Sequence, residues 1–182
     1  MKNRKKCEKR AYTRIKREGI FKVSVVGIIT TQNNIIEIEE KIQSYKINEK
    51  NIIIITKENV SNIKNVKFDM IIIFDQIEED EEIKKVVRES KYVLLNSDYK
   101  ENLKLIDEHT NSYVITFGYN SRASITIISN ENDEIILEIQ REIDLAKNKK
   151  IECQEIKMNN NFAKKYIYEE IAMKILTILL KI

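Results

Sequence analysis

The chain has 182 residues, of which 34% are charged and 42% hydrophobic, a composition typical of a globular domain that can bury a sizeable core. Its longest apolar runs, NIIIIT and MIIIF, are only strand-length, and no apolar segment follows the basic start MKNRKKCEKR, which argues against a membrane span and a secretory signal. Cys7 and Cys153 have no partner at metal-ligand spacing, so two reduced thiols in the cytoplasm are expected.

Positive charge is concentrated near the N-terminus. Residues 2–22 carry ten Lys or Arg against two Glu, a net charge of +8, whereas the remaining residues carry −5 of the chain's total of +3. Such a segment can bind nucleic acid or an anionic membrane surface. It can equally be a solvated tail, because few aromatic residues interleave its charges. We therefore expect a basic arm at residues 1–21 and a single domain at residues 22–182.

Strands and helices are predicted to alternate from residue 22 onward. Short β-branched runs bounded by polar segments predict five strands, at residues 22–29, 51–56, 68–74, 91–95 and 112–117. Apolar spacing and cap residues predict three intervening helices, at residues 33–45, from Asp75 through the charged run that follows, and at residues 98–109. This succession predicts a mainly parallel sheet with helical crossovers.

The pattern changes after Gly118. Three segments alternate apolar and polar residues, which is typical of antiparallel, half-exposed strands: residues 124–129, 135–142 and 151–157. A last helix is predicted at residues 162–180. Its apolar stripe consists of Ile167, Ile171, Ile175, Ile178 and Leu179. This stripe can pack into the core or form the face of a homo-oligomer.

Charged residues at two predicted helices have competing interpretations. Glu78 begins a run of five carboxylates, residues 78–82, near the start of the helix expected after Asp75. Acidic residues in a first turn complement the helix dipole, whereas the alternative interpretation has Asp75 or Glu78 bind a metal ion. His109, the only histidine, is expected at the C-terminal end of its helix, where it would interact with the dipole.

The most specific motif is a strand that ends in Asn-x-Asp, then a helix, then a strand that runs into Thr-Phe-Gly. This layout resembles the end of the central, ATP-binding domain of the Mur ligases, the amino-acid-adding enzymes of cell-wall synthesis. Their pattern there is roughly v-l-N-x-D-D … v-i-T-f-G-x-x-x-x-A. The chain matches it at Asn96, Asp98, Thr116, Phe117, Gly118 and Ala123. The resemblance implies a P-loop-NTPase-like, three-layer α/β fold, with an added antiparallel section near the C-terminus.

The turn after the first strand departs from this family. Mur ligases carry G-T-N-G-K-T-T there, in which backbone N–H groups and the lysine hold phosphates. This chain reads G-I-I-T-T-Q-N-N from Gly27, so the second glycine and the lysine are absent. If a nucleotide binds nonetheless, its candidate residues are Gly27, Thr30, Thr31, Asn96 and Asp98. Without the lysine, tight Mg-ATP binding in the family's mode is not expected.

Three functional hypotheses follow. The first is a non-catalytic, Mur-ligase-like protein that needs no cofactor and binds or scaffolds an unidentified protein partner in cell-envelope processes. The second is an ATP-dependent, ligase-like enzyme whose altered phosphate loop still holds Mg-ATP. The third is a protein that binds nucleic acid or an anionic surface through residues 2–22. The missing glycine and lysine favour the first hypothesis.

Overall fold

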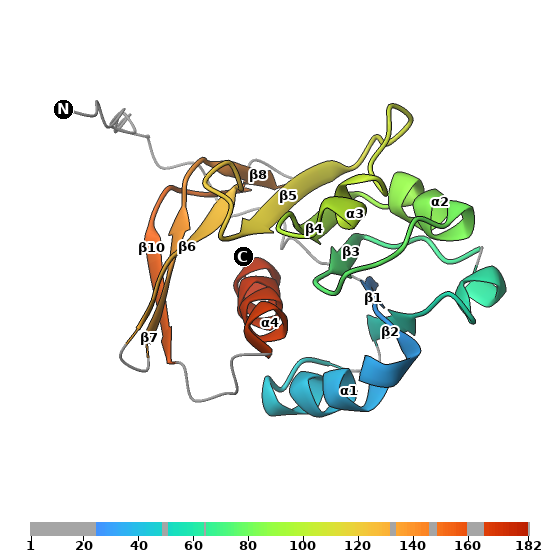
Figure 1. Ribbon diagram of the computed structural model, residues 1–182, viewed down its shortest axis with the longest axis horizontal. Helices are drawn as coiled ribbons and strands as arrows, with labels where there is room; N and C mark the ends of the chain where they lie inside the picture. The colour runs from blue at the N-terminus through green and yellow to red at the C-terminus, as the bar shows by residue number, and fades with distance from the viewer. Residues whose placement is uncertain are drawn as a thin grey trace.

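A mixed sheet of eight strands crosses the part of the chain that the structure, a computed structural model, describes (Figure 1). The described residues are 25–48, 51–63, 65–131, 134–145, 149–159 and 166–181. In spatial order the strands are β10 (Glu155–Asn159), β7 (Glu134–Ile139), β6 (Ile125–Glu131), β5 (Tyr113–Gly118), β4 (Tyr92–Asn96), β3 (Met70–Ile73), β1 (Val26–Ile29) and β2 (Ile52–Ile55). The basic arm expected at residues 1–21 lies outside the described residues, and its roles stay predictions.

Six neighbouring strands pair in parallel, in the spatial order β2, β1, β3, β4, β5 and β6. Strands β7 and β10 continue the sheet in antiparallel pairing. The predicted α/β class, with a mainly parallel sheet and an antiparallel section near the C-terminus, is confirmed. Strands β1, β3 and β4 consist almost entirely of apolar residues because they are buried on both faces. A separate hairpin pairs β8 (Ile143–Leu145) with β9 (Lys149–Ile151).

Helices cover both faces of the parallel part of the sheet (Figure 1). One face carries α1 (Ile35–Ser44), which follows the short 3-10 helix η1 (Gln32–Asn34), and α4 (Ile167–Lys181). The other face carries the 3-10 helix η3 (Val60–Ile63), α2 (Glu81–Glu89) and α3 (Lys100–Leu103). The sheet therefore separates two hydrophobic cores, and the layers form as parallel βαβ connections require.

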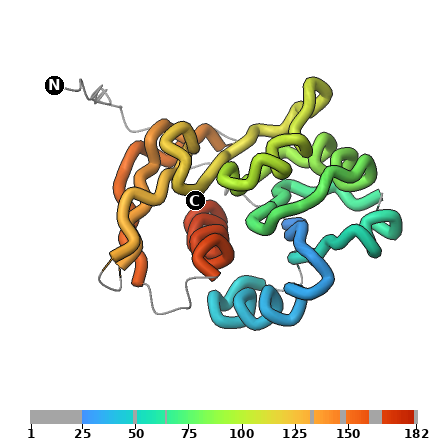
Figure 2. The backbone as a smooth tube through the Cα atoms, viewed as in Figure 1, coloured from blue at the N-terminus to red at the C-terminus, as the bar shows by residue number. Residues whose placement is uncertain are grey.

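Helix α4, late in the chain, lies beside α1, near its beginning (Figure 2). An ion pair between Lys41 and Glu170 joins the two helices, and the Tyr45 hydroxyl donates to Glu170 Oε2 at 2.7 Å. In the apolar stripe of α4, Ile167, Ile171, Ile175 and Leu179 are buried in the chain's own core. The stripe that could have formed a homo-oligomer face is thus largely used for internal packing.

Two predicted helix boundaries are wrong. The helix expected from Asp75 begins only at Glu81, because Asp80 Oδ1 accepts the backbone N–H groups of the first turn at 2.9 and 3.1 Å. The helix expected at residues 98–109 is the four-residue α3. Side-chain bonds around Asp107 compete with helical bonding in the segment that follows. His109 therefore lies in an exposed turn rather than at a helix end.

The strand predicted at residues 151–157 is also wrong as a single element. Ile151 ends β9, which pairs with β8, and Glu155 begins β10, which pairs with β7. The strand predicted at residues 135–142 ends at Ile139. Period-two alternation continues through both regions, so the sequence pattern alone does not reveal where the chain changes sheets.

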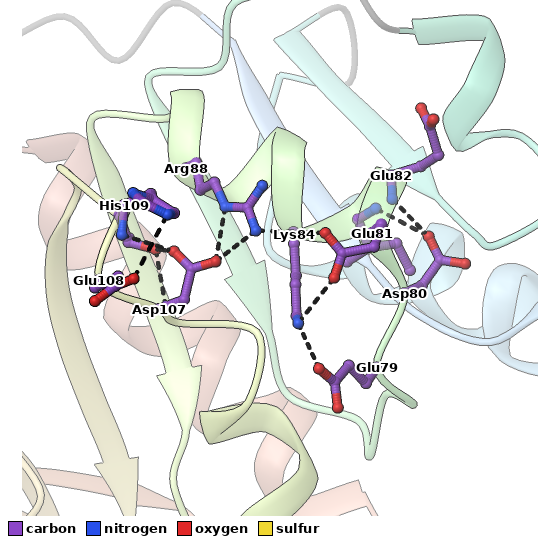
Figure 3. A network of polar contacts seen from close by, with 11 residues as sticks. Glu79, Asp80, Glu81, Glu82, Lys84, Arg88, Asp107, Glu108 and His109 are labelled. Atoms are coloured by element: carbon purple, nitrogen blue, oxygen red, sulfur yellow. Dashed lines mark hydrogen bonds and ion pairs between the residues drawn. The ribbon is translucent and has the colours of Figure 1, made fainter.

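Within the acidic run, residues 79–82 have a structural role at the start of α2 (Figure 3). Asp80 caps α2, and Lys84 pairs with both Glu79 and Glu81, at 3.0 Å from the latter. One turn later, Arg88 Nε donates to Asp107 Oδ2 at 2.8 Å. This guanidinium, helped by bonds from the following turn, lowers the pKa of Asp107 to about 2. Lys84 is buried, and Arg88 and Asp107 are partly buried, so these pairs join α2 to the segment before it and to the turn after α3.

Gly27, expected in a phosphate-binding turn, lies inside β1. A Cβ atom there would meet Ile71 Cδ1 at 2.5 Å, Ile55 Cδ1 at 2.8 Å and Phe68 Cδ1 at 3.0 Å. The glycine therefore lets the core side chains pack closely against its own α-carbon. Its role is to pack the core and not to form a loop.

We expect Gly27→Ala to lower the free energy of unfolding by about 1–3 kcal/mol, because the added methyl overpacks this core. Thr31→Ala, at the exposed turn after β1, serves as the control and should change it by less than about 0.5 kcal/mol. Urea denaturation of the two variants measures both values. Equal stabilities for Gly27→Ala and the parent chain would show that the packing described for Gly27 is wrong.

Candidate functional site

The chain reverses its strand order between β1 and β3. From β1 it moves outward to β2, then crosses back to β3 and continues through β4 to β5 on the other side. In doubly wound sheets, ligands bind outside the carboxyl ends of the strands at such a switch point. The residues that follow β1, β3, β4 and β5 therefore define the place to look for a site.

One carboxylate occupies the turn between β1 and α1. Asp75 Oδ2 accepts a hydrogen bond from the Thr30 hydroxyl and a second one from Asn34 Nδ2 at 3.0 Å. Thr30 is buried, whereas Thr31 is exposed and makes no capping bond with its side chain. The polar side chains that could face a bound phosphate at this turn instead bind the protein's own carboxylate.

Two asparagines hold the loops after β3 and β4 together. Asn96 is fully buried, donates from Nδ2 to the Phe74 carbonyl at 3.0 Å, and accepts the Asp98 backbone N–H on Oδ1 at 3.0 Å. Asn102, on α3, donates to the Asp75 carbonyl at 2.9 Å and accepts the Ile77 N–H at 2.9 Å. These amides satisfy backbone groups that no strand or helix reaches, and so fix the backbone that carries Asp75.

Asp98 links β4, β5 and α4. Its carboxylate accepts the backbone N–H groups of Tyr119 at 2.7 Å and Asn120 at 3.0 Å, and the Tyr168 hydroxyl at 2.9 Å. Burial and the bond to this carboxylate raise the pKa of Tyr168. Gly118 has φ +144°, and a Cβ atom on it would lie 2.6 Å from the Asp98 carboxylate. Asp98 and Gly118 of the motif thus form a single contact that leaves room for no other residue at position 118.

A cavity of about 220 Å³ opens above these loops. Three carboxylates from three different elements line it: Glu37 of α1, Asp75 after β3 and Glu169 of α4. Three tyrosines and two further residues complete its wall: Tyr99, Tyr166, Tyr168, Asn34 and Phe74. No Lys or Arg is among these described lining residues, so the cavity has an acidic wall with aromatic sides.

Glu169 is the most unusual group in this cavity. Its side chain is 8% exposed, and its Oε2 is buried without a hydrogen-bond partner among the described residues. Burial, reinforced by the nearby Asp75 and Glu37 carboxylates, raises its pKa to about 7 from 4.5, although a bond from its own backbone N–H and the charge of Lys41 oppose the shift. Oε1 of Glu37 is likewise buried and unpartnered within the described part of the chain. Such groups are uncommon in folded proteins, and an ordered water or a bound ligand with donor groups would satisfy them.

The structure brings only some of the predicted site residues together. Thr30 and Asp75 are in contact, and Asn96 and Asp98 brace the adjoining loops, but Glu78 is exposed and does not line the cavity. Within the described ranges, no three or more His, Cys, Asp or Glu side chains are grouped to hold a metal ion. Nucleotide binding by the predicted residues stays a prediction.

Sequence reasoning missed Glu37 and Glu169. They are two of the many Glu residues of the chain, they lie on different helices, and 131 residues stand between them in the sequence. A signal was present in Glu169, which together with Glu170 forms an acidic pair between Tyr168 and Ile171 at the start of the largely apolar α4. A carboxylate that is buried among the apolar residues of such a helix needs a polar partner.

Comparison with known proteins adds no identity: no protein-family model matches the chain, and no curated protein sequence matches it. Among the helices of the described residues, none combines the length and the apolar character needed to cross a membrane. The function therefore has to be argued from the cavity and its surrounding loops.

We expect Asn96→Ala to lower the free energy of unfolding by about 1–3 kcal/mol, because the Phe74 carbonyl and the Asp98 N–H would lose their buried partner. Asn33→Ala, the same change at an exposed position, should be nearly neutral. Thermal and urea unfolding of the two variants give the comparison. Similar stabilities for both would mean that the amide is not a brace.

A second prediction concerns pH. The raised pKa of Glu169 means that folded protein holds this proton more tightly than unfolded protein. Its contribution to stability is therefore fully present below about pH 4.5 and is lost as the pH rises through about 7. Glu169→Gln should remove this part of the decline, whereas Glu89→Gln, on an exposed face of α2, should keep it. Parallel stability curves for the parent chain and Glu169→Gln between these pH values would contradict the account.

Proposed function

We propose that this chain is a shortened, degenerate relative of the Mur ligase central domain, and that it is a non-catalytic binding protein of the cytoplasm with a role in cell-envelope processes. The proposal includes a P-loop-NTPase-like origin for the parallel sheet. It takes the cavity at the carboxyl ends of the strands as the binding site.

The observation that carries the proposal is the position of Asp75. Its carboxylate accepts the hydrogen bonds of both Thr30 and Asn34 at the turn where a phosphate loop would follow β1. A phosphate would have to displace this carboxylate or lie beside it. Two like charges at a separation of about 4 Å repel by roughly 4 kcal/mol at an effective dielectric constant of about 20.

The remaining walls of the cavity support the same conclusion. Glu37 and Glu169 add two carboxylates, and the lysine that would neutralise phosphates is missing from the turn. The start of α1 could attract an anion through its backbone N–H groups, but Glu37 lies in that first turn. The charge of the site therefore opposes nucleotide binding and leaves it open to a ligand of another kind.

The motif shared with the Mur ligases supports the family assignment through architecture. Asn96, Asp98 and Gly118 form one set of contacts that holds β4, β5 and α4 at fixed spacing. A scaffold of this kind can be retained after its catalytic groups are lost, because the same contacts hold the loops at the carboxyl ends of β4 and β5.

The proposal predicts that Mg-ATP and Mg-ADP do not bind to the purified chain at concentrations up to about 1 mM, and that ATP is not hydrolysed. Isothermal titration calorimetry and a phosphate-release assay measure the two outcomes. Micromolar binding that is lost in Thr31→Ala would instead establish the alternative, an ATP-binding enzyme with an altered phosphate loop.

A further inference from the structure

The cavity combines two features that point to one kind of ligand. Its carboxylates, Glu37, Asp75 and Glu169, come from elements far apart in the sequence, so they do not form a simple acidic patch on one helix. Its sides are tyrosines, of which Tyr99 and Tyr168 meet edge to face with ring centroids 5.6 Å apart. Carboxylates provide negative charge, and aromatic faces favour cations over anions.

Glu169 provides the second, independent observation. More than nine-tenths of this residue is buried, and its Oε2, which no described residue donates to, belongs to a side chain that lines the cavity. Leaving a buried carboxylate oxygen without a donor costs at least about 1–3 kcal/mol. A ligand with N–H donors and a positive charge would remove this cost, whereas an anion or an apolar ligand would not.

The geometry favours an organic cation over a metal ion. The three carboxylates are not grouped as a metal site, and the cavity of about 220 Å³ is far larger than the roughly 10–15 Å³ that is needed to hold one water molecule. The rim of the site already shows the relevant chemistry, because Lys41 Nζ lies 5.1 Å from the centroid of the Tyr166 ring. Lys41 is itself paired with Glu170 and so does not satisfy Glu169.

We propose that the cavity binds the ammonium group of an alkylamine, with Glu169 and Glu37 as acceptors and the tyrosine rings as its sides. This proposal rests on the proposed function, since it assigns a ligand class to the same non-catalytic pocket. An adjoining open groove of about 320 Å³ is lined by Glu37 and Tyr166 and also by Asn33, Ile36, Glu40 and Lys41; Ile36 is 72% exposed and offers it an apolar surface. The alkyl chain would lie along this groove.

Two sources can supply this chemistry: a free small amine, or a lysine side chain of a partner protein. The experiment therefore titrates the full chain with n-butylamine and with Nα-acetyl-lysine amide, and uses 1-butanol as a neutral probe of similar shape. Chemical-shift changes and calorimetry report binding. We expect saturable binding of at least one amine at about 1 mM or below, and none of the alcohol.

The matched variants are Glu169→Gln and Glu89→Gln. We expect the first to weaken amine binding by about tenfold or more, and the second, on the opposite face of the sheet, to leave it unchanged. Glu37→Gln is the second test of the cavity and should also weaken binding, in case Glu169→Gln perturbs the fold. Binding of butylamine alone identifies a free amine as the ligand, and binding of the capped lysine alone identifies a partner's lysine.

The pH dependence gives a further readout that a purely structural role would not produce. Burial and the Asp75 and Glu37 carboxylates raise the pKa of Glu169, its own backbone N–H and Lys41 lower it, and the result is a pKa of about 7. Since an ammonium group binds the ionised carboxylate, the affinity should rise by about tenfold between about pH 6 and about pH 8 in the parent chain. Glu169→Gln should lose this rise, and Glu89→Gln should keep it.

Several results would overturn the proposal: no saturable amine binding up to about 10 mM, equal binding of 1-butanol, or equal affinities in Glu169→Gln and Glu89→Gln. Binding of Mg²⁺ alone that depends on Glu169 would assign the site to a metal ion and overturn it as well. A parallel titration with Mg-ATP separates the two levels of inference. Absence of both amine and nucleotide binding overturns only the ligand class, whereas nucleotide binding overturns the proposed function.

Discussion

The carboxylate of Asp98 is the contact on which the geometry of the site depends. It joins the turn after β5 to the loop after β4 through two backbone N–H groups, and it joins both to α4 through the Tyr168 hydroxyl. Because Glu169 follows Tyr168 directly, this bond also fixes the position of Glu169 relative to the sheet. Gly118 allows the close approach, as any side chain there would collide with the carboxylate.

Three carboxylates near the carboxyl ends of the parallel strands, those of Asp75, Asp98 and Glu169, have different environments. Asp98 accepts three hydrogen bonds and Asp75 accepts two, so both carboxylates have donors within their loops. Glu169 is buried at the side of the cavity with one oxygen that no described residue satisfies. The structural carboxylates hold the site together, and the unsatisfied one gives it a chemical preference.

The sequence predicts the central parallel strands well, because these strands are buried on both faces and need nearly unbroken apolar runs such as those of β1 and β3. The short α3 and the late start of α2 are not predicted, since side-chain bonds of Asp107 and Asp80 end or begin helices against the apolar pattern. Asn96 and Asp98 are found from their motif, but their role as braces requires the positions of Phe74 and Tyr168. The pairing of Glu37 with Glu169 across one cavity arises from tertiary packing alone.

The central claim is that the buried carboxylate of Glu169 binds a positively charged donor, and the titration of this carboxylate tests the claim most directly. The chain, with ¹³C in its glutamate carboxyl groups and Glu169→Gln for assignment, can be titrated by NMR with and without n-butylamine. The account predicts that the Glu169 carboxyl has a pKa of about 7 in the free protein and that the pKa falls when the amine is added. A pKa near 4.5 that does not respond to the amine would contradict the account, because the carboxylate would then be solvated.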